Sequence, residues 1–168
     1  DRIARTPEKD DPRAMEQRYL CGAVFEKMLN DAKKLEGVDR DKLRIAIARG
    51  LQNQDGHARS KVSGIYERLT FEEIQPLLPA IHDAIVEPAP SGEMFADGVR
   101  LAGLKVLAAH HIEEGMPACA DYVRNQNPWG SQKRIREILP ILLQYGAHAR
   151  SVIPQLREAA DYFETRET

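Results

Sequence analysis

Cysteine and long apolar runs are scarce in this chain. Its two cysteines, Cys21 and Cys119, do not have the spacing of a metal site, and two cysteines cannot hold 168 residues together. We therefore expect both to be small core residues rather than a disulfide. No apolar run approaches the roughly 20 residues that span a membrane, and no signal peptide is recognisable. These absences exclude a disulfide scaffold and predict that no membrane is involved; the compartment stays unassigned.

A strong charge of either sign is also missing. The chain carries 24 basic and 26 acidic side chains, which gives a net charge of −2. Such a chain has no general attraction for phosphates, so the composition argues against nucleic acid as the partner. The length suits a single domain, and 42% hydrophobic residues suffice for a core. Because the sequence starts at Asp1, we expect it to be part of a larger protein.

A proline motif occurs three times at a nearly constant spacing. In each copy an apolar residue precedes the proline and an acid follows four residues later. The copies are Leu78 to Asp83, Met116 to Asp121 and Ile153 to Glu158. The three prolines lie 38 and 37 residues apart, which is the period of stacked helical hairpins. We expect each proline near the start of a second helix, where its missing N–H costs nothing.

The apolar pattern predicts an all-α fold. We expect an α-α superhelix, or solenoid, of about four antiparallel helical hairpins, and no segment alternates as a strand would. Residues 1–10 are predicted to form a disordered lead-in, and Asp11 with Pro12 would begin the first helix. Residues 11–168 would then form one repeat domain, with a break at the proline-rich linker 87–92.

Several helix ends and inward faces follow from local signals. A helix should start after Asp39 and end at the turn 53–56, and a third helix should span residues 57–69. Thr70 and Glu73 form a capping-box pattern, followed by a short turn and a helix over 76–86. Two further helices are expected from Ser131 to Gly146 and at the C-terminal end. The side chains expected to point inward there are Ile135, Ile138, Leu139, Leu142, Leu143, Val152, Ile153, Leu156, Ala160 and Phe163.

One stretch of the sequence resembles a known repeat family. From Leu143 to Glu158 an apolar helix ends at Gly146, a short turn follows, and Ile153 and Pro154 open a second helix. This arrangement is similar to the HEAT-like repeat of the phycobilisome-lyase type, and the resemblance extends over about residues 57–164. It implies an architecture. Members of that superfamily include scaffolds, adaptors, chromophore lyases and a few DNA-repair enzymes, so the fold alone assigns no function.

Two clusters have residue types found in catalytic or metal sites. His110 and His111 precede two glutamates, but adjacent histidines on a helix point about 100° apart and cannot face one ion, so we interpret them as a helix end. Asp55 and His57 are residue types that can serve as a catalytic base and the residue that orients it. No nucleophile is identifiable beside them, and we interpret them as turn residues. We predict no catalytic residue, no metal site and no cofactor.

The candidate binding surface is a basic segment that contains the single tryptophan. It consists of Arg124, Trp129, Lys133, Arg134 and Arg136. Tryptophan beside arginines is typical of a protein-interface hot spot and also of a base-stacking platform. The alternative that we favour is a solvated loop whose tryptophan is folded back against the repeat core. Residues 67–97, by contrast, carry seven acids and a single basic residue, so the two regions differ in local charge and could orient a partner.

These observations favour a non-enzymatic protein-interaction or scaffold module. Its partner would be a protein or another domain of the parent chain, with oligomeric state unassigned. The alternative is a helical-repeat DNA-binding enzyme of the DNA-glycosylase kind, in which a basic concave face grips the duplex. That alternative requires the basic residues of 40–61 and 124–136 to converge on one face. A chromophore or cofactor lyase rests on fold analogy alone.

Overall fold

A computed structural model describes residues 23, 26, 27, 31, 36–126 and 132–165. The described residues form helices joined by turns and loops, without a strand, so the all-α prediction is confirmed. The α-helices are α3 (Arg40–Leu51), α4 (Gly56–Ser63), α5 (Phe71–Ile74), α6 (Leu78–Val86), α7 (Ala96–Ala109), α8 (Gly115–Arg124), α9 (Gln132–Leu143) and α10 (Ile153–Glu164). Short 3-10 helices are η1 (Tyr66–Arg68), η2 (Gln75–Leu77), η3 (Glu93–Phe95) and η4 (Gly146–Val152).

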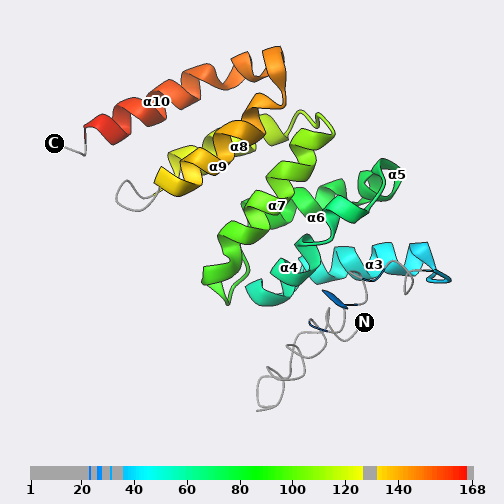
Figure 1. The fold of residues 1–168 in the computed structure, drawn as a ribbon. Coiled ribbons are helices and arrows are strands. Elements are labelled where there is room, and N and C mark those ends of the chain that lie inside the picture. Colours follow the sequence, from blue (N-terminus) through cyan, green and yellow to red (C-terminus); the bar gives the residue numbers. More distant parts are fainter. Residues whose placement is uncertain (1–22, 24–25, 28–30, 32–35, 127–131, 166–168) are drawn as a thin grey trace. The chain divides into compact units, whose positions relative to one another are not determined.

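The chain divides into two compact units, Asp1–Gly103 and Leu104–Thr168. The division falls within α7. In the first unit α3 packs against both α4 and α6, and in the second α8 packs against both α9 and α10 (Figure 1). The superhelical stacking of hairpins and the single domain with a break at 87–92 stay predictions. The predicted lead-in and the helix beginning at Asp11 lie outside the described residues.

The three repeat prolines lie where the sequence predicts. Each falls within the first three residues of its helix, Pro79 in α6, Pro117 in α8 and Pro154 in α10. The first turn of a helix has N–H groups without intrahelical partners, so a proline there loses no hydrogen bond. The proline spacing therefore marks three helix starts.

The start of α5 confirms the capping-box prediction, and α3 starts after Asp39 as expected, with Asp39 as its cap. The Asp39 carboxylate accepts a hydrogen bond from the Lys42 N–H at 3.1 Å. Thr70 and Glu73 form the reciprocal capping box, in which the Glu73 carboxylate accepts from the Thr70 N–H at 2.9 Å. Each cap satisfies backbone donors that a helix start leaves free, which stabilises it by about 1 kcal/mol.

Two predicted helices are shorter in the structure. The helix expected over 57–69 ends at Ser63, because the chain tightens into 3-10 geometry after Gly64, where the Ile65 N–H donates to the Val62 carbonyl. The helix expected over 76–86 starts at Leu78 and ends as predicted at Val86. Pro76 and Pro79 set that later start, since residues 75–77 form a separate 3-10 turn.

The inward faces of α9 and α10 differ from the prediction. Ile138 and Leu142 are buried as expected, but Leu139 and Leu143 are 43% and 76% exposed. Ile141 fills the core in their place, because the inward stripe of α9 runs through positions 138, 141 and 142 at helical spacing. In α10 the buried alanine is Ala159 rather than Ala160, Ile153 is 38% exposed, and Leu156 and Phe163 are half-buried. Val152, just before α10, is buried as predicted.

Leu142→Ala should lower the free energy of unfolding by about 2–5 kcal/mol, because it leaves a cavity in the core of the second unit. Leu139→Ala, three residues earlier on the same helix, should cost less than about 1 kcal/mol, because that side chain is already 43% exposed. Urea unfolding followed by circular dichroism measures both. Equal losses for the two variants would contradict this register of α9.

Two buried tyrosines differ in how their hydroxyls are bonded. The Tyr145 hydroxyl donates to the Ile112 carbonyl at 3.0 Å. The Tyr66 hydroxyl is buried without a hydrogen-bond partner among the described residues. Burial raises the pKa of both phenols, so both stay protonated at neutral pH.

Tyr66→Phe should therefore leave stability unchanged or raise it by up to about 1 kcal/mol, because it removes a hydroxyl that is buried away from water and forms no hydrogen bond in exchange. Tyr145→Phe should lower stability by about 1 kcal/mol, because it removes the hydrogen bond from the hydroxyl to the Ile112 carbonyl, which then keeps only the Gly115 N–H as a donor. Thermal melts of the two variants beside wild type make the comparison. A larger loss for Tyr66→Phe than for Tyr145→Phe would show that this assignment of the hydrogen bonds is wrong.

Candidate functional site

The basic candidate surface is only partly described. Trp129 lies outside the described residues, and of Lys133 the structure describes the helical backbone alone. Arg124 is exposed at the end of α8 and forms an ion pair with Asp121 at 2.9 Å. Arg134 and Arg136 are exposed on α9. The set as a whole stays a prediction, and among its described side chains Arg136 lies beside a further feature of the surface.

That feature is an apolar face of α9. At 3.6 residues per turn the residues of this face fall within an arc of about 140°, so they share one side of the helix: Ile135, Arg136, Leu139, Pro140 and Leu143. We call them the α9 flank. Leu139, Pro140 and Leu143 are exposed and Ile135 is half-buried. The neighbouring face of α9 is buried in the core of the second unit. Sequence reasoning assigned both leucines to the core and so missed this surface.

The α9 flank has a physical reason to interact. Fully burying a leucine side chain is worth about 1.5–3 kcal/mol, and α9 leaves Leu143 three-quarters in water. Single exposed apolar side chains are ordinary, but two leucines and a proline on one helical face form a continuous apolar strip. Arg136 on the same face adds a positive charge and a planar donor group. The α9 flank can therefore bind an apolar segment that also carries acids.

The histidine pair at residues 110 and 111 is a helix end, as predicted. His111 has a positive φ of 53°, and the Ile112 N–H donates to the Leu107 carbonyl at 2.9 Å. This is the hydrogen-bond pattern that closes many helices. The His111 ring meets the Tyr145 ring edge to face at 6.3 Å between centroids. Among the described residues no three histidine, cysteine or acidic side chains come together as metal ligands.

Asp55 lies at the N-cap of α4 and His57 in the first turn of that helix. The Asp55 carboxylate caps α4 by accepting from the His57 backbone N–H at 3.1 Å, and the His57 ring lies edge-on against Phe95. Ser91, which sequence reasoning did not connect with them, joins this turn through the loop 87–92. Its hydroxyl donates to the Gln54 carbonyl at 2.9 Å. These contacts build a junction between two loops and do not align a base with a nucleophile.

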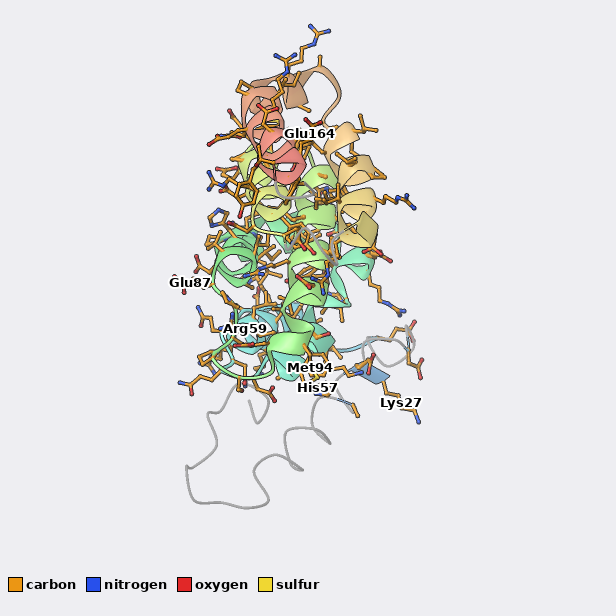
Figure 2. The ribbon with its side chains drawn as sticks, turned by 90° about the vertical axis from the view of Figure 1, so that its left-hand side faces the viewer. Lys27, His57, Arg59, Glu87, Met94 and Glu164 are labelled. Atoms are coloured by element: carbon orange, nitrogen blue, oxygen red, sulfur yellow. The ribbon has the colours of Figure 1, made fainter. Side chains whose placement is uncertain are left out.

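The loop junction, residues 53–56 and 87–92, is the most polar part of the buried interior in the first unit. The Gly56 N–H donates to the Ser91 carbonyl at 2.8 Å, and the Ser91 N–H donates to the Gln54 carbonyl at 3.0 Å. Arg59 donates to the Asn53 and Glu87 carbonyls, at 2.6 Å each. Arg59 and Glu87, which form the second of these contacts, are labelled in Figure 2. The predicted linker 87–92 is thus held to the α3–α4 turn.

Arg59 has a structural task. It is only 9% exposed, and burial lowers the pKa of its guanidinium, an effect that the nearby Glu87 charge opposes. The group stays charged, because arginine loses its proton only far above neutral pH. Its N–H groups satisfy carbonyls of both loops, so Arg59 fixes the loop junction and is not available to an external phosphate.

Other basic residues of the segment 40–61 are also engaged within the chain. Ion pairs join Arg40 to Glu73, Lys42 to Asp39, Arg44 to Asp41 and Lys61 to Glu26. A nucleic-acid surface needs positive charge that is open to phosphates. The convergence of two basic segments on one face, which the DNA-glycosylase alternative requires, receives no support from these contacts.

Cys119 behaves as a core residue, as predicted. Its side chain is fully buried in α8 and forms no disulfide. Burial raises the pKa of its thiol to about 12, so the reactive thiolate is absent at neutral pH. Cys21 lies outside the described residues.

No helix in the described part of the chain is long and apolar enough to cross a membrane. Comparisons of this sequence with family models and curated proteins, and of its structure with solved structures, found no match. The HEAT-like resemblance therefore stays a prediction, and the function is argued from the described surface alone.

Proposed function

We propose that this chain is a non-enzymatic protein-interaction module that binds a partner through the α9 flank. The observation that carries the proposal is the exposure of Leu139 and Leu143 on one side of α9, beside Arg136. A hydrophobic strip with an adjoining arginine has the composition of interface hot spots. The partner fits best as a protein segment that presents apolar side chains together with acids.

Local charge supports an acidic partner. Between residues 124 and 136 the sequence holds four basic residues and no acid, and Glu137 is the first acid that follows. Complementary charge raises association rates and orients partners more than it adds affinity. We therefore expect binding that weakens as salt concentration rises but does not vanish, since the leucines supply an apolar contribution.

A double variant tests this function. Leu139→Ser with Leu143→Ser should weaken binding of a captured partner at least about tenfold, because tenfold corresponds to only 1.4 kcal/mol. The control is Met94→Ser, because Met94 is an apolar side chain of the first unit that is 85% exposed (Figure 2). The partner is captured from the source lysate with wild type, purified, and its affinity measured for each variant by calorimetry.

Equal affinity for wild type and the double variant would overturn the proposal, provided that both proteins melt at the same temperature. Loss of binding in the Met94→Ser control as well would also contradict it. That result would place the contact outside the α9 flank.

A further inference from the structure

A second feature that could receive a ligand lies in the first unit. Between α3 and the α5–η2 segment there is a hollow of about 130 Å³. Its floor is apolar and consists of Leu43, Ile47 and Leu77, each at most 5% exposed, with the half-buried Leu69 at the side. We call this hollow the α3–α5 pocket. None of its residues belongs to the α9 flank.

Two arginines stand at the mouth of the α3–α5 pocket. Arg40 and Arg44 are one turn apart on α3 and therefore share a face of that helix. Arg40 is held in place across the mouth, because its Nε donates to Glu73 Oε1 at 2.6 Å and its Nη2 contacts the same oxygen. Arg44 pairs with Asp41 at 3.4 Å. The pocket thus combines an apolar floor with guanidinium groups at its rim.

We propose that the α3–α5 pocket binds an uncharged aromatic ring. The volume is of the order of an engineered protein cavity of about 150 Å³ that accepts benzene. An aromatic face is attracted to guanidinium groups, whereas an aliphatic group of equal size is not. Such a ring could come from a small molecule or from an aromatic side chain of a peptide.

The charges at the rim explain why the ring is uncharged. Each arginine at the mouth already has a carboxylate partner, and Glu72 is hydrogen-bonded to Thr70. Arg40, Arg44, Asp41, Glu72 and Glu73 all line the pocket, so a charged ligand of either sign would lie beside groups of its own charge. An uncharged ring leaves the ion pairs at the rim intact and displaces only water above Leu43, Ile47 and Leu77.

Phenol and cyclohexanol are the probes, because they match in size and differ in aromaticity. Each is titrated into protein with labelled leucine and isoleucine methyl groups, and the methyl resonances are followed by NMR. Phenol should shift the methyl resonances of Leu43, Ile47 and Leu77, and these shifts should saturate at millimolar phenol. The methyl resonances of Ile138 should not shift. It should bind about two- to fivefold tighter than cyclohexanol. N-acetylphenylalaninamide then tests whether a peptide-borne ring also enters.

Two variants complete the test. Leu69→Trp should fill the pocket and abolish the methyl shifts that phenol causes. Arg40→Gln should lower the affinity for phenol and leave the affinity for cyclohexanol unchanged. Circular dichroism verifies that each variant is folded. Equal affinity of wild type for the two probes, or shifts without saturation below about 20 mM, would overturn the proposal even if Leu69→Trp fails to fold. Because the pocket and the α9 flank share no residue, either proposal can fail without the other.

Discussion

Replacing Gly56 by alanine should lower the free energy of unfolding by about 3 kcal/mol or more. Gly56 is the first residue of α4 and lies directly under the loop 87–92. A Cβ at this position would overlap the Gly92 carbonyl oxygen and approach the Ser91 carbonyl oxygen to 3.1 Å. Both obstacles are backbone atoms, which cannot rotate away as a side chain can. The loop junction would have to open, and urea unfolding of the variant measures the cost.

Gly64→Ala is the matched control for Gly56→Ala. Gly64 follows α4 in the right-handed helical region, and a Cβ there would meet only helix carbonyls at 3.7 and 3.8 Å, which is ordinary contact. Stability should be unchanged or rise by up to about 1 kcal/mol, because alanine restricts the unfolded chain. Similar effects at the two glycines would contradict the close approach of the loops.

Arg59→Met should lower the free energy of unfolding by about 3 kcal/mol. Methionine keeps most of the apolar stem but leaves the Asn53 and Glu87 carbonyls without the donors that Arg59 supplies at 2.6 Å. The contact with the Asn53 carbonyl is buried, and a buried carbonyl left without a partner costs about 1–3 kcal/mol, whereas the contact with the Glu87 carbonyl is only partly buried and adds less. Arg59→Lys should recover only part of the loss, because one ammonium group does not reproduce the fork of a guanidinium. Urea unfolding of both variants gives the values.

The control for Arg59→Met is Arg44→Met on α3. Arg44 forms an exposed pair with Asp41 at 3.4 Å, and such surface pairs are worth less than about 1 kcal/mol. A loss at Arg59 no larger than at Arg44 would mean that the loop junction does not depend on this side chain.

The sequence predicts the helix starts better than the inward faces. Asp39, Thr70 and Glu73 act through hydrogen bonds within four residues, so the local sequence contains all the information that their caps need. The same holds for Pro79, Pro117 and Pro154, because a proline is tolerated in a helix chiefly at its start. These features do not depend on which elements pack together later.

The face of α9 could not be chosen from sequence. Residues 138, 139, 141, 142 and 143 are all aliphatic, and a helix can bury only part of such a set. Which part is buried depends on where α8 and η4 pack against α9. The hydrophobic periodicity of the sequence does not give the positions of these neighbours. The prediction chose 138, 139, 142 and 143, whereas the structure buries 138, 141 and 142.

The loop junction was missed for a different reason. The linker 87–92 contains two prolines and a glycine, and its composition indicates an exposed connection. Its backbone nevertheless bonds to a turn more than 30 residues earlier, and Ala89 is only 8% exposed. Asp55, His57 and Arg59 resemble functional residues in the sequence because they are polar and close together. In the structure Asp55 caps α4, Arg59 bonds to carbonyls of both loops, and the His57 ring lies against Phe95.

Crosslinking from position 143 tests the proposed interaction most directly. A photo-crosslinking phenylalanine derivative replaces Leu143 in one protein and Met94 in another, since both side chains are more than three-quarters exposed. After irradiation in the source lysate, position 143 should give a defined protein adduct that unmodified chain competes away and Arg136→Glu diminishes, whereas position 94 should not give it. The same adducts from both positions, or none from position 143, would contradict binding through the α9 flank.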